Sequence, residues 1–199
     1  MTPTDNHLGG RLPLLSPDEL THDQHKLYNK LDDTLIAWAK KEGFQATTDE
    51  DDKLIGPFNP MLRSPKVSLG FMESLDAEMK KTTLSEKIRQ VIILTVGGVW
   101  QCAYELYAHK IVGKNAGFDQ ATVDTLAAGQ TPATLTTDEL AAHDFTRLLT
   151  SEYRVPEDVY QRALDAFGEE GLTDLIYLAS NYMSICALLN AFAVPAPGK

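Results

Sequence analysis

The fold class of this protein is decided by residues 84–115, which read LSEKIRQVIILTVGGVWQCAYELYAHKIVGKN. Apolar residues recur at helical spacing over 84–96, which predicts a core helix. The pair Gly97-Gly98 is expected to interrupt this helix, because glycine disfavours helical structure. A second helix is predicted over 99–115, and Gly117 follows as a left-handed stop. The stretch therefore predicts two consecutive helices.

Helical periodicity also precedes and follows this stretch. Ser16-Pro17-Asp18-Glu19 has the residues of a helix start, and apolar residues then recur at helical spacing until Gly43. Strand alternation bounded by hairpin turns is absent from the sequence. We therefore expect a compact all-α fold of about eight helices. The further predicted helices cover residues 65–79, 119–129, 136–154, 156–168 and 172–192.

Two segments break the helical pattern. Residues 47–53 (TTDEDDK) are acidic and polar, so we expect an exposed loop. Residues 56–65 (GPFNPMLRSP) contain three prolines, which exclude a regular helix, but their apolar side chains predict that packing orders the segment, over a pocket. We expect an N-terminal helix and acidic loop over residues 1–55, packed on a helical domain over residues 56–199.

Composition and charge exclude several classes of protein. The formal net charge of −10 repels phosphate backbones and anionic lipid, so neither nucleic acid nor a membrane is expected as a partner. Two cysteines are too few for a disulfide framework, and the N-terminus lacks the basic start and apolar stretch of a signal peptide. The apolar segment 172–194 contains polar residues, which favours a core helix over a membrane span. These features predict a cytoplasmic protein.

The candidate catalytic groups lie within residues 102–109. At about 100° per residue, Cys102, Glu105 and His109 fall within roughly 60° of one another on a helix. Cys102 is expected in the first turn after the glycine pair, where unpaired N–H groups and the helix dipole favour a thiolate. Glu105 and His109 are i,i+4 neighbours, and a hydrogen bond between them would fix the imidazole tautomer.

These side chains allow several interpretations. A thiolate beside a histidine suits attack on a peroxide or an acyl group, and a Glu/His pair suits proton transfer beside a carbonyl. The trio could also bind zinc, but no fourth ligand is evident, so no metal site is expected. Alternatively, Cys102 fills space in a helix contact and Glu105 with His109 forms a surface pair. Three other histidines lie on charged helices and are expected to be solvated: His22, His25 and His143.

Taken together, residues 84–119 resemble the carboxymuconolactone decarboxylase family, in particular its alkylhydroperoxidase D-like branch. That branch has a helix that opens with Leu-Ser and acidic residues, then Cys-x-x-Cys-x-x-x-His, and then Ala-Gly with an acidic cap. Residues 56–65 and 182–195 also resemble the family's longer members. The resemblance implies an all-helical fold whose subunits associate as dimers, trimers or hexamers. The matching residues are Leu84-Ser85-Glu86, Cys102, His109 and Ala116-Gly117-Phe118-Asp119.

The chain departs from the redox members of that family at two positions. Glu105 stands where the second cysteine belongs, and Gln90 stands where those members carry the glutamate that starts a proton relay. Glutamine cannot carry a proton, and Glu105 cannot form a disulfide with Cys102, so dithiol peroxidase chemistry does not follow from the resemblance. Cys186 could react with an oxidised Cys102, and a one-cysteine cycle with an external thiol is a further alternative.

The sequence thus predicts an acid–base enzyme that decarboxylates or isomerises a small organic acid or lactone. The candidate catalytic residues are Cys102, Glu105 and His109. A single-cysteine, thiol-dependent hydroperoxide reductase is the second hypothesis, and a non-catalytic helical oligomer that binds a small molecule or a protein is the third. No cofactor is expected. The candidate substrate-binding residues are Gln90, Trp100, Tyr104 and Phe58.

Overall fold

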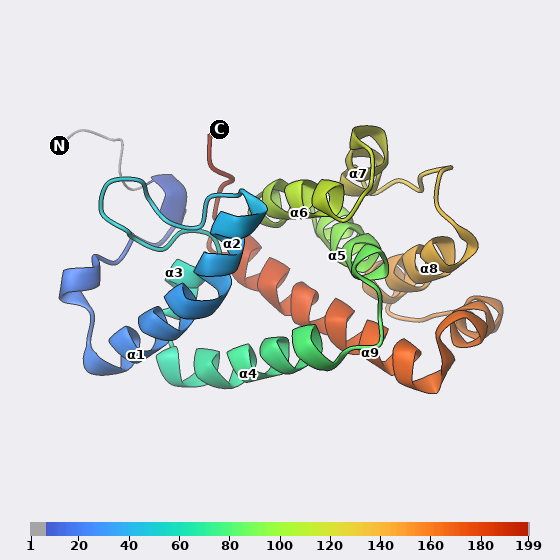
Figure 1. Cartoon of the computed structure of the whole chain (residues 1–199), viewed down its shortest axis with the longest axis horizontal. Helices are drawn as coiled ribbons and strands as arrows, with labels where there is room; N and C mark the ends of the chain where they lie inside the picture. Colours follow the sequence, from blue (N-terminus) through green and yellow to red (C-terminus); the bar gives the residue numbers. More distant parts are fainter. Residues whose placement is uncertain (1–6, 199) are drawn as a thin grey trace.

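The computed structural model describes residues 7–198 and confirms the predicted all-α fold (Figure 1). Within those residues, β structure is limited to an isolated bridge between Thr47 and Leu54. A π-helical turn, η3, joins α1 to α2. The elements are η1 (His7–Gly9), η2 (Pro17–Glu19), α1 (His22–Leu31), η3 (Asp32–Ile36), α2 (Ala37–Glu42), α3 (Phe58–Met61), α4 (Pro65–Lys81), α5 (Glu86–Trp100), α6 (Ala103–Asn115), α7 (Gln120–Ala127), α8 (Thr137–Glu152) and α9 (Glu157–Ala191).

Helix α5 lies at the centre of the molecule. Its residues 90–98 are all buried, and it packs against α6, α7, α8 and α9 (Figure 1). The helix begins after Ser85, whose hydroxyl accepts a hydrogen bond from the backbone N–H of Ile88. Burial on all sides agrees with its sequence, because residues 91–96 (VIILTV) carry no charged face.

The prediction that Gly97-Gly98 interrupts the helix is wrong. α5 continues to Trp100 and ends where Gln101 adopts left-handed backbone angles (φ 48°, ψ 44°). Gly98 instead permits close contact with the end of α7, because a Cβ at this position would lie 2.4 Å from the carbonyl oxygen of Leu126. Cys102 is consequently the N-cap of α6, in an extended conformation just before the helix.

The segment before α3 is held against α6 by two tyrosines. The hydroxyl of Tyr104 donates to the carbonyl of Gln45 (2.7 Å), and the backbone N–H of Gln45 donates to the hydroxyl of Tyr107 (3.0 Å). Gly56 lets the chain pass the ring of Tyr104, since a Cβ there would lie 2.3 Å from the ring. The Pro-rich segment forms one short helix, α3, where no regular helix was expected, and its four residues are buried. The division at residue 55 stays a prediction.

Helix α1 begins later than the sequence predicted. Its N-cap is Thr21, which forms a capping box with Gln24, whereas the Pro17–Glu19 segment is the separate 3-10 turn η2. The apolar stripe that predicted the helix is nevertheless buried, because Leu27 and Leu31 have no exposed surface.

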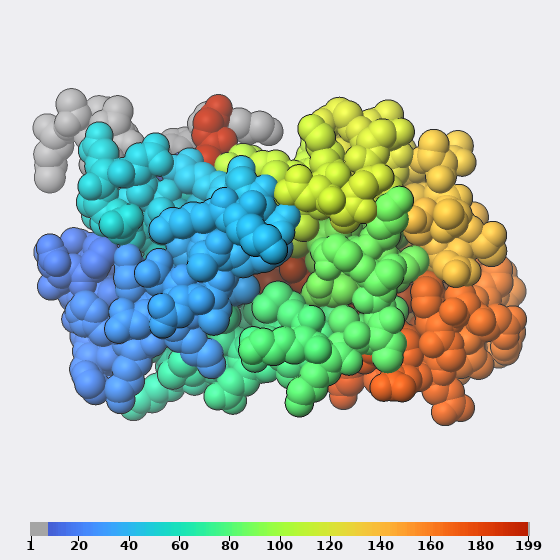
Figure 2. Space-filling view, in the orientation of Figure 1, coloured from blue at the N-terminus to red at the C-terminus, as the bar shows by residue number. Residues whose placement is uncertain are grey.

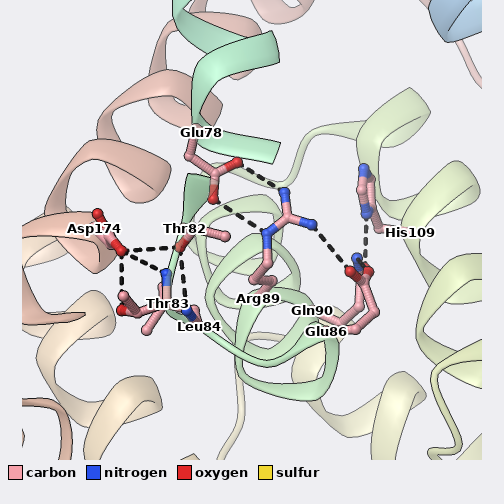
Figure 3. A network of polar contacts seen from close by, with 9 residues as sticks. All are labelled: Glu78, Thr82, Thr83, Leu84, Glu86, Arg89, Gln90, His109 and Asp174. Atoms are coloured by element: carbon pink, nitrogen blue, oxygen red, sulfur yellow. Dashed lines mark hydrogen bonds and ion pairs between the residues drawn. The ribbon is translucent and has the colours of Figure 1, made fainter. Parts of the chain in front are cut away.

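By length and composition, α9 is the one helix among residues 7–198 that could cross a membrane. It packs against α4, α5 and α8, as core helices do. Its backbone is non-helical at Gly168 (φ 66°, ψ −179°), which confirms the predicted break at this glycine. Asp174 of α9 accepts hydrogen bonds from the backbone N–H and the hydroxyl of Thr83 (2.8 and 3.0 Å), in the turn between α4 and α5 (Figure 3).

Candidate active site

Glu105 and His109 lie where α6 faces two adjoining cavities. His109 lines both cavities, and Glu105 lines the inner one. The outer cavity has a volume of about 300 Å³ and lies among α2, α4, α5, α6 and α9. Figure 2 shows its mouth as a hollow between α2 (blue) and the α4–α5 region (green), with α9 (red) visible at the bottom. The inner cavity, about 50 Å³, is bordered by apolar side chains that include Leu35, Trp38, Phe44, Phe58, Met61 and Ile185.

Gln90 fixes the tautomer of His109. The amide nitrogen of Gln90 donates to Glu86 Oε1 (2.7 Å), which turns the amide oxygen towards the imidazole (Figure 3). That oxygen lies 2.8 Å from His109 Nδ1. A carbonyl oxygen can only accept, so Nδ1 carries a proton and donates it to Gln90. The other ring nitrogen, Nε2, is therefore the atom of His109 that can gain or lose a proton.

Glu105 faces that second nitrogen. Its Oε1 lies 3.0 Å from His109 Nε2, and both side chains are 5% exposed. With Nδ1–H held by Gln90, a hydrogen bond across this gap needs one proton between Glu105 and His109. Either it is on the imidazolium, which donates to a carboxylate, or it is on Glu105, which donates to a neutral ring. The pair can therefore take up or release a proton at a site from which water is largely excluded.

Two aromatic residues that the sequence analysis missed enclose the imidazole. Tyr182 packs edge-on against the His109 ring (centroids 5.2 Å apart), and Trp38 lies on another side at 6.1 Å. Both line both cavities. Burial, and then the charge of Glu105, raise the pKa of Tyr182 well above its usual value, so its hydroxyl stays protonated. Trp38 and Tyr182 lie far from His109 in the sequence, and only the fold brings them to it.

The outer cavity is lined by two carboxylates and one guanidinium, those of Glu42, Glu86 and Arg89. Arg89 is shared by two carboxylates: it binds Glu78 through two hydrogen bonds (3.1 and 2.7 Å) and Glu86 through one (3.0 Å), as Figure 3 shows. Glu42 also lines this cavity. Since Glu78 and Glu86 already bind Arg89, the charge of its guanidinium is offset before an anionic ligand could bind. The cavity therefore favours a neutral molecule over a carboxylate.

Cys102 does not join Glu105 and His109 at the cavities. It lines neither of them, its side chain is fully buried, and its thiol is hydrogen-bonded by the thiol of Cys186 on α9. Helical spacing predicted all three side chains on one face. Because Cys102 is the extended N-cap (φ −83°, ψ 104°), the spacing of 100° per residue does not apply to it.

The other candidate residues differ in position. Gln90 lines the outer cavity, and Phe58 and Tyr104 line the inner one, whereas Trp100 lines neither. Burial, followed by the charges of Glu105 and Tyr107, raises the pKa of Tyr104 well above its usual value, so this residue anchors the loop at Gln45 and does not exchange a proton. Among residues 7–198, no cluster of three or more His, Cys, Asp or Glu side chains could hold a metal ion.

The expectation for the remaining histidines is partly wrong. His22 and His25 are exposed, as predicted, but His143 is 1% exposed on the core face of α8. Its Nδ1 lies 3.2 Å from Asp144 Oδ1. Burial lowers the pKa of His143, although Asp144 partly opposes the shift. The core face of α8 contains several polar residues, so hydrophobic periodicity did not reveal it.

Comparisons with known proteins identify the fold. No family model matches the sequence, and no curated protein matches it. Solved structures do match. An uncharacterized peroxidase-related protein from Ralstonia eutropha, described as an alkylhydroperoxidase AhpD core, has a TM-score of 0.72 at 16% identity, over 94% of this chain and 92% of that one. This chain has the alkylhydroperoxidase D-like fold.

Two further structures share the alkylhydroperoxidase D-like fold. An uncharacterized peroxidase-related protein from a Silicibacter species has a TM-score of 0.71 at 16% identity, over 99% of this chain and 96% of that one. The debrominase Bmp8, in complex with 2,3,4-tribromopyrrole, has a TM-score of 0.70 at 12% identity, over 95% and 94%. At such low identities the likeness shows the fold alone. The activities in these names are those of the other proteins.

Proposed function

We propose that this protein is an acid–base enzyme that moves a proton on a small neutral carbonyl compound, with a lactone as the best-fitting class. The observation that carries the proposal is the hydrogen-bonded chain from Gln90 through His109 to Glu105, at the wall that two cavities share. General acid–base catalysis needs such a positioned pair within reach of substrate, and contributes about 10²–10⁴-fold in rate.

The proposed reaction is the isomerisation of an unsaturated lactone. The carboxylate of Glu105 removes a proton from the carbon next to the lactone carbonyl, which leaves a conjugated enolate. The imidazolium of His109, held by Gln90, stabilises the negative charge that develops. Glu105 then returns the proton to the far end of the conjugated system, which moves the double bond. No proton is gained or lost overall, and Tyr182 and Trp38 keep water from the site.

The surroundings of the pair support a neutral substrate. The inner cavity is bordered by aromatic and aliphatic side chains, and the outer one by more carboxylates than guanidinium groups. An organic acid would bring a further negative charge beside Glu42 and Glu86. Isomerisation of a lactone is therefore favoured over decarboxylation of an acid. Thiol-dependent reduction ranks second, because Cys102 lines neither cavity.

The proposal is tested with α-angelica lactone, a small neutral lactone whose double bond can move into conjugation with its carbonyl. We expect the chain to accelerate this isomerisation, followed by the ultraviolet absorbance of the conjugated product, and to act less on acetoacetate. Glu105→Gln and His109→Gln should lower the rate by about 10²-fold or more. His143→Gln is the matched control, because it removes a buried histidine that lines neither cavity and should keep the rate.

Two results would count against the proposal. One is an isomerisation rate that the Glu105 and His109 variants leave unchanged. The other is the absence of turnover with both probes while the chain reduces a hydroperoxide in a Cys102-dependent manner, which would favour the second hypothesis.

We also propose that the chain associates with copies of itself. Large apolar side chains are exposed on α4 and α9: Val67 is 73% exposed and Tyr177 is 63% exposed. Covering such side chains is a common driving force for association. Light scattering should give a native mass that is a multiple of 21.9 kDa, and a strictly monomeric species would contradict this proposal.

A further inference from the structure

Cys102 and Cys186 meet in the core, next to the acid–base site but outside its cavities. The thiols of Cys186 and Cys102 are hydrogen-bonded to each other, and neither side chain has exposed surface. The chain contains no other cysteine. One thiol comes from the N-cap of α6 and the other from near the C-terminal end of α9, so the contact joins two helices that are far apart in the sequence.

The flanking contacts show that this pairing is built into the packing of the two helices. One turn before Cys186 on α9, Tyr182 packs against His109. One turn after it, the side-chain amide of Asn190 donates to the carbonyl oxygen of Trp100 (2.9 Å). Residues four apart lie on one face of a helix. This face of α9 therefore meets α6 at His109 and the end of α5 at Trp100, with the cysteine pair in between.

We propose that Cys102 and Cys186 are a redox pair that closes into a disulfide and fastens the start of α6 to α9. The inference does not rest on the proposed acid–base function. It gives a role to two thiols that lie outside both cavities. The proposed bond joins two helices, whereas the bond of a two-cysteine motif lies within one helix.

The oxidant is a small peroxide, with hydrogen peroxide as the probe. The sulfur of Cys102 attacks one peroxide oxygen; the sulfur–oxygen bond forms, the oxygen–oxygen bond breaks, and the departing hydroxide takes up the thiol proton as water. Cys186 then attacks the oxidised sulfur of Cys102. The sulfur–sulfur bond forms, and the leaving hydroxide combines with the proton of Cys186 as a second water. Two thiols are oxidised and one peroxide is reduced.

The environments of the two thiols set their order of reaction. The hydrogen bond to Cys102, burial and the charge of Glu105 all raise the pKa of Cys186, so this thiol keeps its proton. Cys102 precedes the unpaired N–H groups of α6, an arrangement that favours attack by its sulfur first. Because both sulfurs are buried, oxidation waits on local opening, and we expect one slow oxidation per chain rather than rapid turnover.

The test uses the full chain, reduced and then treated with hydrogen peroxide. Intact mass should fall by two hydrogen atoms, and denatured oxidised chain should take up no iodoacetamide until dithiothreitol is added. Peptide mapping should join the peptides of Cys102 and Cys186. The midpoint of thermal unfolding should rise by roughly 10 °C, because the bond closes a loop of roughly 80 residues. Cys102→Ala and Cys186→Ala should abolish the loss of mass.

Three outcomes would overturn the inference. They are thiols that gain oxygen atoms without losing two hydrogens, disulfides that form only between chains, and thiols that stay reduced in the folded chain at all peroxide exposures that leave it folded. If an alanine variant fails to fold, the mass and peptide map of the unaltered chain still decide. The intact mass, the iodoacetamide labelling and the peptide map do not depend on activity. Loss of lactone isomerisation in any variant therefore tests the proposed function alone.

Discussion

Replacing Glu105 by glutamine should separate the chemistry of the site from its stability. Because Gln90 holds the Nδ1 proton of His109, Nε2 can accept a hydrogen bond from a neutral donor. The amide of glutamine can supply that donor across the 3.0 Å that separate the pair. Leucine at position 105 cannot. Glutamine does not exchange protons, however, so it removes the catalytic proton while it preserves the contact.

The expected magnitudes follow from the burial of the pair. A hydrogen bond to a charged group contributes about 1.5–3 kcal/mol and a neutral one about 0.5–1.5 kcal/mol, so Glu105→Gln should lower the free energy of unfolding by about 1 kcal/mol. Glu105→Leu leaves His109 Nε2 buried without a partner, and the total loss should be about 3 kcal/mol. For a slope of about 2.5 kcal/mol per molar urea, the midpoints fall by about 0.4 M and about 1.2 M respectively.

Urea unfolding followed by circular dichroism measures the stability of both variants, and the isomerisation of α-angelica lactone measures their activity. Glutamine should leave stability nearly intact yet lower the rate by about 10²-fold or more, whereas leucine should lower both. Equal destabilisation by glutamine and leucine would refute the assignment of the Nδ1 tautomer. A glutamine variant with full activity would refute the role of Glu105.

Two further predictions concern packing and pH. Gly98→Ala places a Cβ 2.4 Å from a backbone oxygen, so it should destabilise the chain by about 1–3 kcal/mol in urea unfolding. Gly70→Ala, with no atom within 4 Å of its Cβ, should stabilise the chain by about 0.5–1 kcal/mol. The reverse order of stabilities would contradict the close contact of α5 and α7. Burial lowers the pKa of His143 below its ordinary value of 6.5, so the unfolded chain binds this proton more tightly, and stability should fall as the pH drops below about 6.5 towards the lowered value. His143→Gln should flatten that part of the pH–stability curve, and an unchanged curve would show that His143 does not contribute.

The fold and the Glu105–His109 pair could be predicted because they depend on local spacing. Glu105 and His109 are four residues apart on one helix, and this spacing alone places their side chains within hydrogen-bonding distance. Gln90 was identified as the residue in the relay position by resemblance, and the structure adds that its amide binds His109 Nδ1. Helical periodicity likewise predicted the all-α class.

The rest of the site depends on how distant segments pack. Trp38 and Tyr182 reach His109 from α2 and α9, and Cys186 reaches Cys102 from α9, contacts that no spacing within one helix encodes. Gly98 shows a different limit. A glycine within an apolar run can end a helix or permit a close helix contact, and only the position of the carbonyl of Leu126 distinguishes the two.

The most direct test of the acid–base proposal is the origin of the proton that the pair delivers. In ordinary water, isomerisation by the chain of α-angelica lactone that carries deuterium at the carbon next to its carbonyl should move deuterium to the ring carbon that carries the methyl group, as measured by deuterium NMR of the product. The Glu105→Gln variant should lose this enzyme-dependent signal, and His143→Gln should keep it. Deuterium that appears at the same rate in the presence of the Glu105→Gln variant as with the unaltered chain would contradict proton transfer by the Glu105–His109 pair.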